Sequence, residues 1–238
     1  MTLSFKEDHI SQIPALMMLE KVGYTYLTPA EAMELRGGNT SNVLLEPILR
    51  EQLAKINTVQ VSSQRTTVFS EQNITAGIEA LRNLPMAEGF MTASQVAYDL
   101  LTAGKTLEQI VDGDKKSYVM QYIDWKHIEN NAFHVTEEFA VSRTGMSDTY
   151  RPDIVLFVNG IPLCVIECKR PDIKDSLKQA ISQHLRNQKE DGIRSLYVYS
   201  ALLLATNVNE ASYATTATPE KFWSKWTEQF ADKNAEEL

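Results

Sequence analysis

The chain has 238 residues, of which 43% are hydrophobic and 23% are charged. This composition supplies the material for a packed core and excludes a globally disordered protein. The formal net charge is −8, whereas free-standing nucleic-acid-binding proteins are generally basic. Any contact with phosphate groups must therefore come from a local basic patch or from partner subunits.

The sequence shows no sign of membrane association. No apolar stretch has the length that crosses a bilayer, and the first residues turn acidic without a signal-peptide core. We therefore expect a cytoplasmic protein that does not contact membranes. Cys164 and Cys168 lie in one apolar run; two thiols alone make a poor zinc site, so we expect buried, reduced cysteines. The four histidines lack the spacing of a metal site or a catalytic triad.

The first half of the chain reads as mostly helical. Residues 6–22 have a rough 3.6-residue apolar period, which predicts a helix that ends at Gly23 and is kinked or restarted at Pro14. A short aromatic strand is predicted over residues 24–27. From residue 29 to about 130 the helical pattern dominates, and further helices are predicted over residues 29–36, 43–55, 71–83, 94–102 and 106–111.

Strand patterns appear after residue 130. Two β-branched apolar runs flank Asn159-Gly160, which is a strong hairpin signal. Strands are predicted over residues 133–141, 153–158, 161–168 and 196–205, and helices over 172–190 and from Pro219 onward. This order predicts an α/β fold, an α/β/α sandwich with a mixed central sheet and a helical insertion.

Three charged residues interrupt the apolar stretch of the predicted hairpin: Asp153, Glu167 and Lys169. A charge at the end of a buried strand is costly unless it is paired or binds a metal ion. Two carboxylates and the backbone carbonyl of Cys168 form a hard-oxygen site suited to Mg²⁺. Lys169 can orient or help deprotonate a water molecule and offset charge in the transition state. The set indicates phosphodiester hydrolysis.

The hairpin register decides whether the two carboxylates meet. A regular two-residue loop at Asn159-Gly160 pairs Asp153 with Ile166, so that Glu167 faces away from Asp153. A three-residue loop pairs Asp153 with Val165 and places the two carboxylates as diagonal neighbours, roughly 7 Å apart. We therefore predict an odd loop or a β-bulge. The competing interpretation is a surface salt bridge at the strand ends, with Asp153 as a turn or cap residue.

These residues resemble the PD-(D/E)xK nuclease superfamily. More closely, the chain resembles the N-terminal nuclease region of the restriction (R) subunit of type I restriction–modification enzymes. Blocks in three parts of the chain carry the resemblance and together span nearly all of it: residues 6–24, residues 151–155 with 165–171, and residues 203–207 with 219–223.

The resemblance implies roles for individual residues. Asp153 and Glu167 resemble the metal ligands of the family, and Lys169 resembles its catalytic lysine. A Gln-x-x-x-Tyr motif follows in the family; here Gln183 fits the glutamine, but Asn187 stands where the tyrosine is expected. Glu7 matches an acid on the N-terminal helix that can approach the metal ion, although a solvated acid near a helix start fits equally well.

The resemblance also implies an ATP-driven motor and partner subunits. This chain contains no phosphate loop, so the motor is expected beyond residue 238. Double-stranded DNA would be fed in by the motor, and sequence recognition would come from the methyltransferase and specificity subunits. Residues 167–194 hold seven basic and five acidic residues, a net charge of +2. We expect Arg170, Lys174 and Arg186 from this stretch to contact DNA.

The chain is accordingly divided into four parts. Residues 1–28 supply the first helix and strand of the nuclease domain, residues 29–130 a mostly helical insertion, residues 131–230 the nuclease core with the site, and residues 231–238 the start of a linker to the motor. Two functions remain open. The set Asp153, Glu167 and Lys169 favours a type I DNA endonuclease, whereas Asn187 in place of tyrosine favours a catalytically silent module that docks DNA or subunits.

Overall fold

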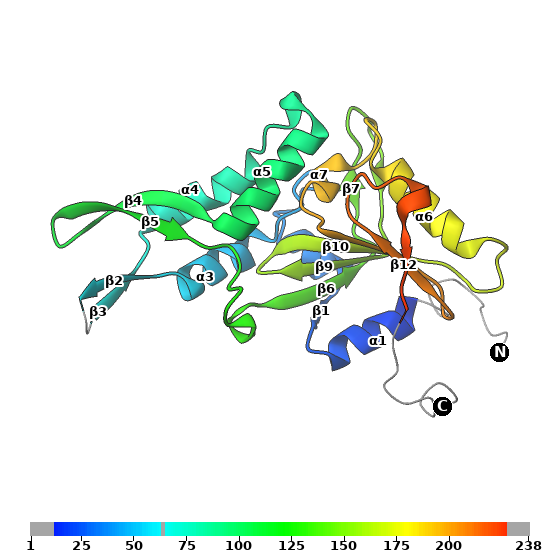
Figure 1. Cartoon of the computed structure of the whole chain (residues 1–238), viewed down its shortest axis with the longest axis horizontal. Helices are drawn as coiled ribbons and strands as arrows, with labels where there is room; N and C mark the ends of the chain where they lie inside the picture. Colours follow the sequence, from blue (N-terminus) through cyan, green and yellow to red (C-terminus); the bar gives the residue numbers. More distant parts are fainter. Residues whose placement is uncertain (1–11, 63–64, 228–238) are drawn as a thin grey trace.

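A seven-stranded mixed sheet forms the centre of the computed structural model, which describes residues 12–62 and 65–227 (Figure 1). The pairs β1–β6 and β10–β11 are parallel, and the other pairs are antiparallel. The predicted α/β fold with a mixed sheet is therefore confirmed. In order across the sheet the strands are β1 (Thr25–Leu27), β6 (Phe133–Glu137), β9 (Ile154–Val158), β10 (Ile161–Cys168), β11 (Leu202–Thr206), β12 (Ala211–Ala214) and β13 (Ser224–Lys225).

Helices cover both faces of the sheet, on opposite sides in Figure 1. Alternate residues of β9 and β10, including Ile154 and Ile166, pack with Leu16 of α1 (Ile13–Lys21). The intervening residues, including Val155 and Val165, join the main core on the other face. The amphipathic helix α6 (Ser176–Asn187) packs against β10 and β11. Cys164 and Cys168 are both buried, as expected, and neither is part of a disulfide.

The segment before β6 holds helices and two hairpins that project from the sheet (Figure 1). The predicted helix over residues 106–111 is wrong, because these residues form a strand that returns through Asp112-Gly113. Both turn residues have positive φ, 53° and 87°, as a two-residue Asp-Gly hairpin turn requires. The helices are α2 (Pro29–Glu34), α3 (Glu46–Ile56), α4 (Glu71–Arg82) and α5 (Phe90–Ala103), and the hairpin strands are β2 (Thr58–Ser62), β3 (Arg65–Val68), β4 (Lys105–Val111) and β5 (Asp114–Met120).

The C-terminal part departs from the predicted elements. The apolar run 196–205 was expected as one strand, but it contains the end of the short helix α7 (Arg194–Tyr197) and then β11. Both pieces contribute buried residues to the core, so apolar content alone does not separate them. The helix predicted from Pro219 is only a 3₁₀ turn, η4 (Glu220–Phe222), followed by the edge strand β13. The remaining elements are η2 (Met86–Glu88), η3 (Ile128–Asn130), β7 (Val141–Ser142) and β8 (Thr149–Tyr150).

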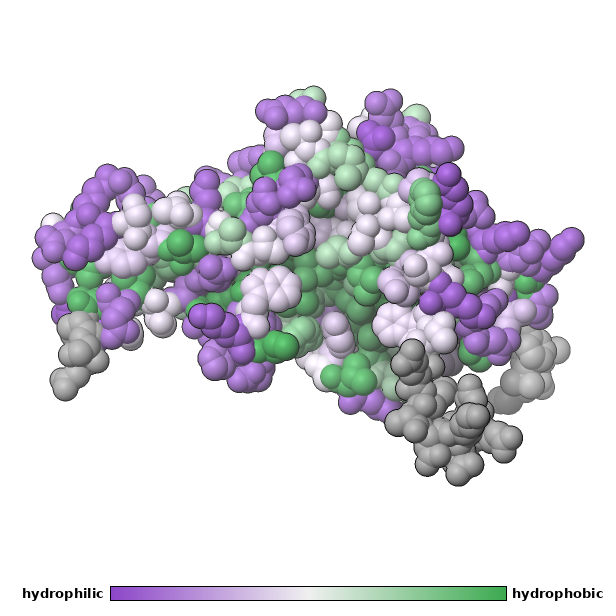
Figure 2. Space-filling view, viewed as in Figure 1, coloured by the Kyte–Doolittle hydropathy of each residue, from purple (hydrophilic) through white to green (hydrophobic). Residues whose placement is uncertain are grey.

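In Figure 2, hydrophilic residues cover the projecting hairpins at the left and the end of the molecule at the right. Hydrophobic residues are visible mainly in the middle of this face. Within residues 12–62 and 65–227, no helix is long and apolar enough to span a bilayer.

The β9–β10 hairpin combines a two-residue turn with a β-bulge. Asn159 and Gly160 both have positive φ, 53° and 80°, and Val158 pairs with Ile161 across them. The register then shifts between Pro162 and Cys164, so that Leu163 is the extra residue. The predicted three-residue loop is wrong, but the alternative prediction of a bulge is confirmed. Proline has no N–H for the ladder, and bulges are among the few sheet positions that accept it.

The turn of this hairpin is hydrogen-bonded to the residue before α3. The backbone N–H of Leu45 donates to the Gly160 carbonyl at 2.9 Å. A Cβ atom on Gly160 would lie 2.6 Å from the Leu45 carbonyl oxygen, which is closer than van der Waals contact permits. Gly160 is therefore required both by its positive φ and by the backbone that passes beside it.

Gly160→Ala should lower the free energy of unfolding by about 3 kcal/mol, because a left-handed alanine and a backbone clash act together. Gly113→Ala is the matched control: Gly113 also has positive φ, but no atom lies within 4 Å of its added Cβ. The control should lose only about 1 kcal/mol. Urea denaturation measures both, and equal losses would contradict the close approach at Gly160.

Candidate active site

Asp153 and Glu167 lie next to each other on one face of the sheet. Because of the bulge, Ile154 pairs with Ile166, so the next pair outward along the two strands is Asp153 and Glu167. Directly opposite residues on antiparallel strands have Cβ atoms about 5 Å apart and point to the same face. The register thus brings together two acids that a regular hairpin would place on opposite faces.

Backbone and side-chain groups hold Asp153 and Lys169 together. The Asp153 Oδ2 atom accepts a hydrogen bond of 2.7 Å from the Cys168 N–H. The Lys169 Nζ atom lies 3.6 Å from the same Oδ2 and donates to the Cys168 carbonyl at 3.0 Å. Only 15% of the Asp153 side chain and 11% of the Lys169 side chain are exposed. The ammonium group and the carboxylate therefore meet at the rim of the core rather than in open solvent.

Glu167 is fully buried, and α6 supplies an amide donor to each of its carboxylate oxygens. Gln183 donates to Oε2, and Asn187 donates to Oε1 at 3.3 Å. Gln183 and Asn187 are four residues apart, so they stand one turn apart on the same helix face. The packing of α6 on β10 and β11 turns that face toward Glu167.

The electrostatic environment of Glu167 disfavours its charged form. Burial raises the pKa of Glu167 well above its usual value, and the nearby Asp153 carboxyl raises it further. The Lys169 ammonium lowers the pKa but does not offset these effects. Two acids thus face one desolvated spot with a single ammonium group beside them, an arrangement that a divalent cation would stabilise.

The donor atoms at this spot fit Mg²⁺. Magnesium ions prefer oxygen ligands and are usually held by one or two carboxylates, with water and phosphate oxygens completing the shell. Asp153, Glu167 and the Cys168 carbonyl provide such a partial set. In the part of the chain that the structure describes, no group of three or more His, Cys, Asp or Glu side chains is placed to hold a metal ion. Glu7, the expected additional ligand, lies outside the described residues.

The residues expected to contact DNA lie in different environments. Arg170 directly follows Lys169 and is ion-paired with Asp172. Lys174 is exposed in the loop before α6. Arg186 is exposed on α6, and its guanidinium lies 4.5 Å from the centroid of the Tyr150 ring. Arg186 is linked to the Glu167 carboxylate through Asn187, because it hydrogen-bonds to the Asn187 side chain, which donates to Glu167.

Two buried residues near Glu167 were not predicted as part of the site. Tyr197 is fully buried in α7 and its hydroxyl lies 3.4 Å from the Asn187 amide nitrogen. His184 is fully buried on α6 and lies 2.9 Å from the same hydroxyl. The buried residues of α6 are Ser176, Ala180, Ile181, His184 and Asn187, so the available sequence signal was a histidine and an asparagine among the small and apolar residues of one helix face.

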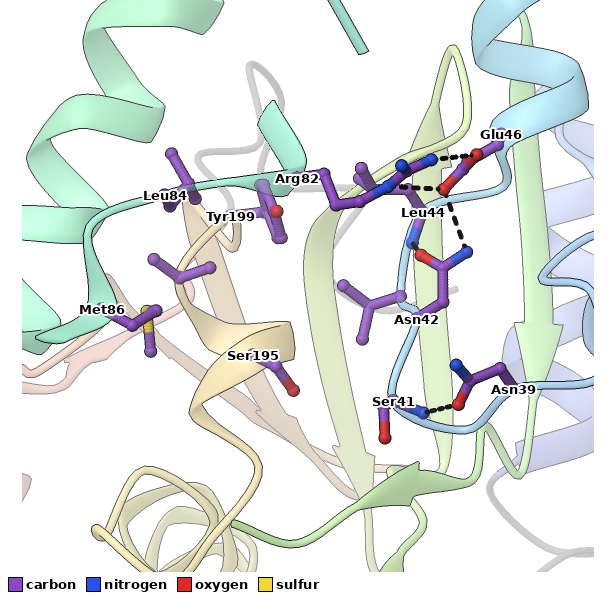
Figure 3. A pocket seen from close by; sticks show the side chains of 12 residues that line it. Asn39, Ser41, Asn42, Leu44, Glu46, Arg82, Leu84, Met86, Ser195 and Tyr199 are labelled. Atoms are coloured by element: carbon purple, nitrogen blue, oxygen red, sulfur yellow. Dashed lines mark hydrogen bonds and ion pairs between the residues drawn. The ribbon is translucent and has the colours of Figure 1, made fainter. Parts of the chain in front are cut away.

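A separate cavity of about 390 Å³ lies away from these residues (Figure 3). Asn42 and Arg82 both point toward Glu46 there: Arg82 is ion-paired with Glu46 at 2.5 Å, and the Asn42 amide donates to it at 3.3 Å. None of its lining residues belongs to the acidic site. Since these polar groups satisfy one another, the cavity offers no comparable chemistry.

Comparison with known proteins shows which family this chain resembles. The family described as "Type I restriction enzyme R protein N terminus" matches residues 4–222. A putative type I restriction enzyme MjaIXP endonuclease subunit of Methanocaldococcus jannaschii is 25% identical over 92% of this chain and 20% of its own length. The type I restriction enzyme HindI endonuclease subunit of Haemophilus influenzae is 29% identical over 84% of this chain and 18% of its own length.

The chain therefore spans about a fifth of the length of these curated relatives. The family match covers far more than half of the chain, including every described strand of the central sheet except β13. The chain belongs to the family of type I restriction enzyme R protein N-terminal regions.

Proposed function

We propose that this chain is the Mg²⁺-dependent endonuclease region of a type I restriction enzyme R subunit and that it hydrolyses double-stranded DNA. The observation that supports it most directly is that Asp153, Glu167 and Lys169 lie together at the adjoining ends of the central strands β9 and β10. The similarity to proteins named as type I restriction endonuclease subunits supports the same conclusion.

The proposed chemistry follows from the atoms present. Mg²⁺ would be held by Asp153, Glu167 and the Cys168 carbonyl, and would supply Lewis-acid activation of the phosphodiester and of the attacking water. Lys169 would orient that water, help to remove its proton and offset negative charge on the transition state. Gln183 would hold the Glu167 carboxylate in place through its hydrogen bond to Oε2.

DNA and the remaining subunits complete this proposal. Arg170, Lys174 and Arg186 would contact the DNA backbone, so that a chain with a net charge of −8 binds phosphate through a local patch. ATP would be used by the motor of the R subunit, and the methyltransferase and specificity subunits would recognise the DNA sequence. The silent docking module remains the second candidate, favoured by Asn187 at the position of the motif tyrosine.

Asp153→Asn, Glu167→Gln and Lys169→Met should each reduce DNA cleavage at least about a hundredfold, because each removes a group that contacts the metal ion or the reacting phosphate. The assay follows plasmid linearisation by the complete R subunit with its partner subunits, Mg²⁺ and ATP, while ATP hydrolysis is measured in parallel. ATP hydrolysis should stay at the wild-type level, since the motor is not altered.

The control for this assay is another Asp–Lys pair. Asp114 and Lys116 lie 3.5 Å apart on β5 but are mostly exposed, so Asp114→Asn and Lys116→Met should leave cleavage unchanged. If the three site variants cut DNA as fast as the wild type, the silent docking module replaces the endonuclease as the function of this chain.

Glu167→Gln should make the stability of the protein less dependent on pH when no divalent cation is present. The folded-state pKa of Glu167 is raised, so ionisation of Glu167 costs stability progressively as the pH rises above its unfolded value. In EDTA, raising the pH from about 5 to about 8 should therefore lower the unfolding temperature of the wild type more than that of the variant. Thermal unfolding should also show that Mg²⁺ stabilises the wild type but not the variant. An equal pH dependence of the two proteins in EDTA would contradict the cost of the buried carboxylate.

Lys174→Ala should weaken DNA binding without changing sequence preference. Loss of one phosphate contact lowers the slope of log K against log salt by about 1. The measurement is fluorescence anisotropy with a short duplex in the uncleaving Asp153→Asn background, from low to moderate salt. Lys116→Ala, on the projecting hairpin, serves as the control. A slope identical to that of the control would remove Lys174 from the DNA-contacting set.

A further inference from the structure

A second series of buried polar groups reaches Glu167 from α6 and α7. The family motif places a tyrosine where this chain has Asn187, and the hydroxyl of a tyrosine from another element, Tyr197, lies next to the Asn187 side chain. Tyr197 comes from α7, ten residues later, and its hydroxyl contacts both the Asn187 amide at 3.4 Å and the His184 ring at 2.9 Å. All three side chains are fully buried, so each hydrogen bond needs a defined donor and acceptor.

The direction of these hydrogen bonds is fixed at the far end by a backbone carbonyl. His184 Nε2 lies 3.1 Å from the Leu204 carbonyl oxygen, which can only accept, so Nε2 carries the proton. Burial lowers the pKa of His184 to about 4, so the ring is neutral and its Nδ1 is an acceptor. The Tyr197 hydroxyl must therefore donate to Nδ1, and its oxygen is left to accept from the Asn187 amide.

The orientation of the Asn187 amide is fixed independently. The guanidinium of Arg186 donates to the Asn187 Oδ1 atom from Nε at 3.3 Å and from Nη2 at 3.1 Å. An arginine has no acceptor atom, so the oxygen of the amide must face Arg186. The NH₂ group then faces Tyr197 on one side and the Glu167 Oε1 atom on the other, at 3.3 Å.

We propose that Asn187 and Tyr197, with His184 behind them, act as positioning residues that hold the Glu167 carboxylate in its metal-binding orientation and so take over the role of the missing motif tyrosine. This inference rests on the proposed metal-dependent function. We call the hydrogen-bonded series from the Leu204 carbonyl through His184, Tyr197 and Asn187 to Glu167 the relay. It runs from β11 to β10, and Leu204 pairs with Ile166 in the parallel register. Both ends of the relay are therefore anchored in adjacent strands.

The position of Glu167 is defined on both oxygens by this arrangement. Gln183 approaches Oε2 and the relay approaches Oε1, so rotation of the carboxyl group breaks a hydrogen bond on either side. Groups that orient metal ligands in this way typically contribute tenfold to a hundredfold in metal affinity. Tyr197 touches neither the metal ion nor the DNA in this scheme, and acts only through Asn187.

The test is Mn²⁺ binding, read from the electron paramagnetic resonance signal of free Mn²⁺, to the R protein that carries this chain, without nucleotide. Tyr197→Phe removes one hydroxyl and should weaken binding about tenfold, and Asn187→Ala should weaken it by at least as much. Tyr199→Phe is the matched control. Tyr199 is also buried, and its hydroxyl donates to the Leu81 carbonyl at 2.6 Å, but no hydrogen bond links it to Glu167.

The Tyr199→Phe control should lose stability to a similar extent as Tyr197→Phe and yet bind Mn²⁺ like the wild type. A double variant distinguishes coupling through the relay from a general loss of structure around the site. Because Tyr197 acts through Asn187, the double variant Tyr197→Phe/Asn187→Ala should bind Mn²⁺ no more weakly than Asn187→Ala alone. If Asn187→Ala does not fold, the comparison of Tyr197→Phe with Tyr199→Phe decides the question.

The outcomes for this inference and for the proposed function are distinct. If the wild type binds Mn²⁺ no better than Asp153→Asn does, the metal site itself is refuted. If Asp153→Asn abolishes binding but Tyr197→Phe matches Tyr199→Phe, the metal site stands and the relay is wrong. Additive losses in the double variant would also refute the relay, since they would show that the two residues act separately.

Discussion

The register of the β9–β10 hairpin is the constraint on which the site depends. One extra residue, Leu163, shifts the pairing so that Ile154 meets Ile166, and Asp153 then stands beside Glu167 instead of facing the other side of the sheet. The period of a strand is two, so without the bulge every side chain beyond it would change face. The two-residue turn at Asn159-Gly160 and its contact with the start of α3 keep this register in place.

The same register places two carboxyl groups side by side in a desolvated environment, which costs free energy that a bound divalent cation would offset. A fully buried Glu167 beside Asp153 is disfavoured as an ion, and the surrounding amides and Lys169 reduce the cost without removing it. Buried ionisable groups with perturbed pKa values are common at functional sites, where a bound ligand stabilises the charged form that burial disfavours. The amide donors on α6 and the hydroxyl of Tyr197 fix the orientation of the Glu167 carboxylate but do not neutralise its charge. This is the property expected of a preorganised metal ligand.

Much of this could be predicted from the sequence, because the signals were local. Asn159-Gly160 indicated the hairpin, and the charges at 153, 167 and 169 indicated the end of it at which the candidate site lies. The bulge was predicted only as one of two ways to bring the acids together, since the choice between an odd loop and a bulge depends on tertiary contacts such as Leu45 with Gly160. The strand after Gly104 was missed although Asp112-Gly113 is a hairpin signal of the same kind. Tyr197 and His184 could not be assigned from sequence, because their link to Glu167 exists only through the packing of α6 and α7 on the sheet.

Asp153, Glu167 and the Cys168 carbonyl are proposed to bind one divalent cation between them. The most direct measurement is a crystal structure of the protein soaked in Mn²⁺, with the ion located by its anomalous scattering. A peak is expected at coordination distance, about 2 Å, from oxygens of Asp153 and Glu167, and it should disappear in Asp153→Asn crystals. A soaked, well-ordered crystal with no peak at this spot, or with the Asp153 carboxyl turned away from Glu167, would contradict it.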